Sequence, residues 1–144
     1  MMRLAAQDAE DLTILSARLQ DAAAKLSGFV YKGKQRRFAA MVNRLEWEKG
    51  GKTRVRAGLH FDSVLGVKTR NVKLGAKDAV ISILAITFTP NAVDDPAGVI
   101  EIVLAGDGAI RLEVECIDAE LADVTRPWTA RATPDHGASS SDKN

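Results

Sequence analysis

Two histidines and one cysteine are the side chains in this sequence that come nearest to a catalytic or metal-binding set. His60 falls on the outward side of an alternating segment, near Arg56 and Asp62, and we interpret it as a sheet-surface histidine. A general base would need an orienting carboxylate and a substrate within hydrogen-bond reach, and neither is evident from the sequence. Cys116 takes an inward position in its segment, which favours packing over nucleophilic chemistry. Because His136 is far from both, no zinc-ligand spacing exists, and no metal site is predicted.

Three other motifs that could suggest chemistry have simpler interpretations. Asp94 and Asp95 lack the further oxygen ligands that a divalent cation needs, so they indicate a solvated loop. Gly106-Asp107-Gly108 is followed by neither Lys-Ser/Thr nor a helix, so it indicates a hairpin turn rather than a phosphate loop. Trp128 follows Pro127 after the last expected strand, and we expect it to cap the open end of a curled sheet. The sequence therefore predicts no catalytic residue and no cofactor.

Charge is divided unevenly along the chain, although the formal net charge is only +1. Residues 1–77 carry sixteen Lys and Arg against seven Asp and Glu, a net +9, whereas residues 78–144 carry four against twelve, a net −8. One interpretation is that strands of the two halves pair in one sheet, with Arg54 and Arg56 beside Glu113 and Glu115. The alternatives are a basic surface for a polyanion or an acidic protein, and a homodimer that joins opposite halves of two copies.

The basic surface would be formed by residues 32–73. Its candidate binding residues lie in the first hairpin and on the outer side of the strand that follows: Lys34, Arg36, Arg37, Arg54, Arg56 and His60. Nucleic acid is a less favoured partner, because single-strand binders interleave exposed aromatic side chains, and only Tyr31 and Trp47 lie near the basic turns.

Length and composition are those of one ordinary globular domain. The chain has 144 residues, of which 46% are hydrophobic and 27% charged. A single cysteine suits a reducing compartment, and the N-terminal residues show no apolar stretch of signal-peptide length. The longest apolar run, residues 79–88, is half of the roughly 20 residues that a bilayer span needs. We therefore expect a cytoplasmic protein that does not enter membranes.

A helix is predicted over residues 8–27, because apolar residues recur at three- and four-residue steps from Leu12 to Leu26. Acidic residues at its start place negative charge at the positive end of the helix dipole, which stabilises the helix. Gly28 would close the other end in the left-handed conformation. Lys25 would then face solvent.

From residue 29 the apolar period changes to two, which predicts a sheet. A first hairpin joins residues 29–31 to 37–47, and a strand follows with Val55 to Phe61 alternately inward. Another strand pair is expected around residues 68–71, and residues 79–89 should form a central strand covered on both faces. A second hairpin turns at residues 106–108, after which the apolar phase slips by one at Ile117-Asp118, as at a bulge or corner.

These elements predict an α+β domain, with an N-terminal helix followed by a mostly antiparallel, curled and partly barrel-like sheet of about seven to eight strands. The domain should span residues 1–128. Residues 129–144 contain too little apolar area to offset the entropy of ordering, so a disordered tail is expected there.

Four segments of the sequence together resemble a known bacterial family: residues 58–65, 84–88, 94–98 and 108–117. The family is domain of unknown function 2948, associated with alphaproteobacteria, and the resemblance covers about residues 4–128. It implies a small single-domain cytoplasmic protein without an assigned activity, so it contributes no catalytic residues.

The leading functional hypothesis is a non-enzymatic binding or adaptor domain whose basic surface takes a protein or an anionic partner. The first alternative is an enzyme or small-molecule-binding protein with a pocket in the curled sheet, using His60, Arg56 or Asp62 for polar contacts. The second alternative is a homodimeric structural protein held together by its complementary halves.

Overall fold

A computed structural model describes residues 1–130 of the chain, and the structural statements below concern those residues. One α-helix, α1 (Ala9–Leu19), stands near the N-terminus, and eleven strands form a single antiparallel sheet. The prediction of a helix followed by a mostly antiparallel sheet is confirmed, but the predicted strand count of seven to eight is wrong. The helix also does not come first, because β1 (Arg3–Ala6) precedes it.

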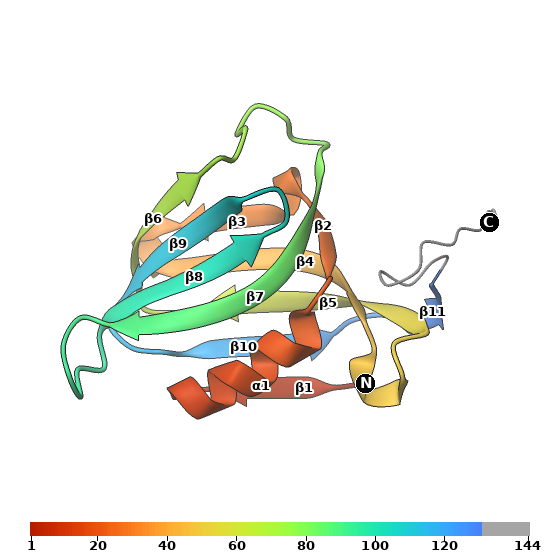
Figure 1. The fold of residues 1–144 in the computed structure, drawn as a ribbon, viewed down its shortest axis with the longest axis horizontal. Helices are drawn as coiled ribbons and strands as arrows, with labels where there is room; N and C mark the ends of the chain where they lie inside the picture. The colour runs from red at the N-terminus through yellow and green to blue at the C-terminus, as the bar shows by residue number, and fades with distance from the viewer. Residues whose placement is uncertain (131–144) are drawn as a thin grey trace.

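The sheet has two layers that pack face to face (Figure 1). The first layer contains β1, β10 (Ala119–Asp123), β5 (Thr53–Phe61), β4 (Arg37–Leu45) and β3 (Phe29–Lys32), with β11 (Trp128–Thr129) beside the start of β5. The second layer contains β7 (Val80–Pro90), β8 (Gly98–Leu104), β9 (Gly108–Val114) and β6 (Val64–Arg70). The three-residue strand β2 (Ala23–Lys25) pairs with both β4 and β7 and so joins the layers.

The sheet is not closed, so the predicted barrel-like shape is wrong. The hydrogen-bonded path ends at β1 on one side and at β6 on the other, and β3 pairs only with β4. Strands β1, β3 and β6 therefore each keep one edge without a strand partner among the described residues. Helix α1 packs across the opening between β1 and β7 (Figure 1).

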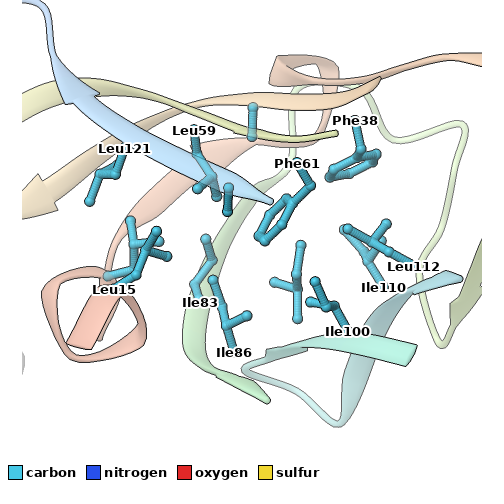
Figure 2. Packing of buried hydrophobic residues seen from close by; sticks show 14 of the residues in the cluster. Leu15, Phe38, Leu59, Phe61, Ile83, Ile86, Ile100, Ile110, Leu112 and Leu121 are labelled. Atoms are coloured by element: carbon cyan, nitrogen blue, oxygen red, sulfur yellow. The ribbon is translucent and has the colours of Figure 1, made fainter. Parts of the chain in front are cut away.

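One apolar core lies between the layers. The inward residues of β5, namely Val55, Ala57, Leu59 and Phe61, are all buried, as their alternation predicts. Figure 2 shows Phe38, Leu59 and Phe61 of the first layer packing toward Ile100, Ile110 and Leu112 of the second, with Leu15 of α1 closing one side. The core uses most of the large apolar side chains of the described residues.

Helix α1 ends eight residues earlier than predicted. The chain leaves helical geometry at Gln20, and Asp21 has a φ of 63°, so the left-handed position lies there and not at Gly28. Trp47 Nε1 donates a 2.8 Å hydrogen bond to the Gln20 carbonyl, and Asp21 N donates to Ile83 O. Pairing of the following residues with β7 therefore replaces the two further helical turns that the apolar spacing suggested.

Two strand predictions in the middle of the chain are also wrong. The expected strand pair around residues 68–71 is a single strand, β6, that pairs with β9. The strand expected to be covered on both faces, β7, buries only Ile83 and Ile86, while Leu84 and Val80 are exposed. By contrast, the phase slip at Ile117-Asp118 is confirmed, because this corner carries the chain from β9 in one layer to β10 in the other.

The rest of the predicted tail, from residue 131 onward, lies outside the described residues. Thr129 belongs to β11, and Ala130 N donates a hydrogen bond to Lys52 O. Helix α1 is not long and apolar enough to cross a membrane, and no other α-helix occurs among residues 1–130.

Ser16 couples α1 to the unpaired part of the β7 edge, because its Oγ accepts a 2.8 Å hydrogen bond from Ile86 N. Replacing Ser16 with alanine should lower the free energy of unfolding by about 1–3 kcal/mol, since a part-buried amide loses its acceptor. Urea unfolding would measure this change. Thr13→Ala is the matched control, because the Thr13 hydroxyl bonds only the Ala9 carbonyl of its own helix on an exposed face. Equal losses in the two variants would contradict the coupling role.

Candidate functional site

The six predicted binding residues do not form one surface of free charge. Arg36, at the turn between β3 and β4, pairs with Glu115 at 3.2 Å, and Arg37 makes two hydrogen bonds to Asp62, at 2.7 and 3.2 Å. Lys34 is exposed and has no carboxylate within ion-pair distance among the described residues. The charges of Arg36 and Arg37 are therefore each paired with a carboxylate, whereas Lys34 is solvated.

His60 lies between two carboxylates on the outer face of the first layer. Its Nε2 is 3.2 Å from Glu120 Oε1, and its Nδ1 is 3.4 Å from Asp62 Oδ2 without making a hydrogen bond. The hydrogen bond from Arg37 is the largest of the effects that lower the pKa of Asp62, and the bond from Arg3 is the largest of those that lower the pKa of Glu120. Both carboxylates are thus held in the charged form, and both ring nitrogens of His60 face them. The two carboxylates therefore hold the His60 ring in place from both sides on this outer face.

Ion pairs join the two oppositely charged halves of the chain. Among residues 1–130, Arg and Lys side chains make eight ion pairs with carboxylates, and four of these connect residues 1–77 with residues 78–130: Arg3–Glu120, Arg36–Glu115, Arg44–Asp123 and Arg70–Glu101. The particular neighbours that we expected for Arg54 and Arg56 are wrong. Arg54 lies opposite Leu45 and Trp128, and Arg56 lies opposite Asn43, far along the sheet from Glu113, which lies opposite Val99 in the second layer.

Arg56 instead lines a hollow formed where β2, β4 and β5 meet on the outer face. We call this the basic hollow; its volume is about 380 Å³, and its lining residues are Ala23, Ala24, Lys25, Ser27, Gly28, Met41, Asn43, Arg56 and Val80. Lys25 and Arg56 are its charged residues, and no carboxylate lines it. Arg56 Nε donates to Asn43 Oδ1 at 3.3 Å, and neither Arg56 nor Lys25 has an ion-pair partner among the described residues.

Local geometry brings these residues together. Ala23 of β2 pairs with Asn43 of β4, and Asn43 pairs with Arg56 of β5, so the three positions form one row across the sheet. At the upper wall, a Cβ on Gly28 would lie 3.2 Å from Met41 O, so the absence of a side chain lets the turn approach β4 closely. Lys25 lines the hollow because residues 23–25 form a strand. The helix predicted over residues 8–27 placed Lys25 facing solvent instead.

Arg54 lies next to the basic hollow and donates a 2.8 Å hydrogen bond from Nη1 to Asn43 O. Burial lowers the pKa of Arg54, with the charge of Asp21 acting in the opposite direction. A guanidinium nevertheless remains protonated at neutral pH. This half-buried cation bonds a carbonyl and has no carboxylate within ion-pair distance among residues 1–130. Arg54 therefore lies beside the hollow, with the opposite charge of Asp21 acting on it.

A buried ion cluster at the lower end of the core was not predicted. Arg44 is fully buried and bonds Asp123 through Nε and Nη2, both at 3.0 Å, and Glu48 through Nη1 at 3.0 Å and Nη2 at 2.8 Å. Met2 N donates to Asp123 Oδ2 at 3.0 Å. Burial acts to lower the pKa of Arg44, but its hydrogen bonds to Glu48 and Asp123 raise the pKa overall. The cluster ties β1, β4 and β10 together, and the side chains of Arg44 and Asp123 are 0% and 2% exposed, so we assign it to the fold.

The remaining candidates lie apart from the basic hollow. Cys116 follows the end of β9 and is half-buried, so the predicted inward position in the strand is wrong. Trp128 is 42% exposed and lies opposite Arg54. Among residues 1–130, no group of three His, Cys, Asp or Glu side chains is arranged to hold a metal ion.

Comparison with known proteins gives one match. The sequence model of a family described as a protein of unknown function (DUF2948) matches residues 2–136. No curated protein and no solved structure matches the chain.

Proposed function

The chain belongs to this family of unknown function, and we propose that it is a non-enzymatic binding domain that takes an anionic group in the basic hollow. The observation that carries the proposal is that Lys25 and Arg56 line this hollow and no carboxylate does, whereas Arg36, Arg37 and Arg44 are each paired with one. We also propose a cytoplasmic location, which the single cysteine supports.

Uncompensated positive charge in a concave site favours an anionic ligand. Low-dielectric walls weaken screening, and the walls here include Ala23, Ala24 and Met41. The planar guanidinium of Arg56 can present two parallel N–H donors to a carboxylate or phosphate, and the Lys25 ammonium can add a third charge-assisted bond. The anion can belong to a small molecule or to an acidic segment of a protein partner.

The proposal is tested by titrating the full-length protein with sodium tripolyphosphate at low salt and following the backbone amides by NMR. We expect the largest shifts at Lys25, Asn43 and Arg56. The variant Arg56→Glu should lower the affinity at least tenfold, because one charge-assisted hydrogen bond contributes about 1.5–3 kcal/mol. Addition of 0.5 M sodium chloride should weaken binding strongly as well.

Lys34→Glu is the control variant. It makes the same change in net charge at an exposed lysine outside the basic hollow, and its affinity should stay within about twofold of the unmodified protein. Similar losses in the two variants would show that tripolyphosphate responds to total charge alone, and shifts centred away from β2 and β4 would reject the site.

A further inference from the structure

A second hollow lies between the two layers, beside β3 and β6, and its lining is mostly apolar. We call it the apolar groove; it has a volume of about 360 Å³, and it is walled by Phe29 and Tyr31 of β3, Val67 of β6, and Val72, Leu74 and Lys77 of the connection that follows β6. Its floor includes Phe38 and Ile110, which belong to the core and are 4% and 3% exposed. The groove therefore gives a ligand direct access to the side of the core.

The groove exists because the sheet is not closed. Strands β3 and β6 are edge strands that do not pair with each other, and β6 is the last strand of its layer (Figure 1). At one end they are tied, since Tyr31 Oη donates to Val64 O and Val64 N donates to Arg36 O, both at 2.9 Å. Beside this tie, apolar side chains of both strands line the groove.

The chemistry of the walls specifies the ligand class. Lys77 is the one cationic residue of the lining, no carboxylate lines the groove, and the Tyr31 hydroxyl is already engaged. Leu74 is 63% exposed at the rim, which is a large apolar surface to leave in water. An apolar trough with a single positive charge complements a molecule with one hydrocarbon chain and one negative charge.

We propose that the apolar groove binds the hydrocarbon chain of a free fatty acid, with the carboxylate paired to Lys77. The volume lies within the range of small-ligand sites, at its lower end, which suits a single chain and not a two-chain lipid. This inference goes beyond the basic hollow, although Ser27 lines both sites and makes them neighbours.

Calorimetric titration with octanoate, decanoate and dodecanoate below their micellar concentrations tests the proposal. Each fully buried methylene should raise the affinity about fourfold until the groove is filled. Lys77→Glu should weaken dodecanoate binding about tenfold and leave dodecanol binding unchanged, because only the charged head contacts the ammonium. Leu74→Asp should weaken both ligands, and its exposure means that the fold should tolerate the change.

Two control variants separate this site from its surroundings. Lys73→Glu changes the same charge on the same connection but outside the lining, so it should leave dodecanoate binding within twofold. Arg56→Glu should also leave dodecanoate binding unchanged. The proposal for the apolar groove can therefore fail independently of the proposal for the basic hollow. Affinity that does not grow with chain length, or equal losses in Lys73→Glu and Lys77→Glu, would overturn the proposal. Binding to phosphatidylglycerol vesicles without uptake of dodecanoate would overturn it in favour of a membrane surface.

Discussion

Replacing Arg44 with alanine is expected to lower the free energy of unfolding by about 3–5 kcal/mol, one of the two largest effects that we predict for a single substitution. The change removes one guanidinium that makes four hydrogen bonds to two carboxylates, and it leaves Asp123 almost fully buried without its cation. Urea unfolding at pH 7 would measure the loss.

Arg37→Ala is the matched control for this experiment. Arg37 also bonds one carboxylate twice, but its side chain is 45% exposed and that of Asp62 is 27% exposed. The loss should be about 1 kcal/mol or less, because water solvates both groups when the pair is broken. An Arg44→Ala loss no larger than this would contradict the structural role of the buried cluster.

The effect of Arg44→Ala should also depend on pH with a defined sign. The hydrogen bond from Arg44 is the main cause that lowers the pKa of Glu48 below its ordinary value of 4.5. A lowered native pKa contributes stability that is fully present above the unfolded value and is lost as the pH falls through the native value. The stability difference between the unmodified protein and Arg44→Ala should therefore be constant near neutral pH and should narrow below about pH 4.5.

Gly98→Ala is the second substitution with a large expected effect. A Cβ at this position would overlap the Thr89 carbonyl oxygen and would lie 2.8 Å from both Phe88 Cε1 and Pro90 Cα. Gly98 pairs with Pro90 at the start of β8, so two of the three atoms that occupy the space are backbone atoms of β7, which cannot move aside as a flexible side-chain end can. We expect the free energy of unfolding to fall by about 3 kcal/mol or more, because the hairpin must shift to admit one methyl group.

Gly58→Ala separates this overlap from a general effect of strand glycines. Gly58 lies within β5, and a Cβ there would meet no atom within 4 Å. Alanine at this position should be neutral or should stabilise the protein by up to about 1 kcal/mol, because it reduces the conformational entropy of the unfolded chain. Thermal unfolding of the two variants side by side would check the prediction, and similar midpoints would contradict it.

The alternation of apolar residues was sufficient to predict much of the sheet. It located both hairpins and the inward residues of β5, and it identified the corner at Ile117-Asp118, because a period of two depends only on which face of a strand is buried. The prediction failed where pairing partners decide the structure. Ala22, Ala23 and Leu26 suit a helix by spacing and composition, and only the pairing of residues 23–25 with β7 and β4 makes this segment a strand followed by a short turn.

The same limit applies to the functional site. Arg54 and Arg56 could be proposed from their outward alternation, but Lys25 was assigned to the solvent side of a helix, so the basic hollow could not be anticipated. The Arg44 cluster did leave a signal in the sequence. Arg44 continues the inward positions of Phe38, Ala40 and Val42, and Asp123 continues those of Ala119 and Leu121, so two opposite charges occupied core positions.

The pairing of β1 with β10 determines when this protein can finish folding during synthesis. Arg3 lies opposite Ala122, so β1 has no partner during synthesis until nearly all of the described chain has followed it. Contacts of such long sequence separation form slowly, and an early apolar segment without its partner is open to wrong pairings in the meantime. A chaperone would therefore be most useful in shielding β1 until β10 has been made.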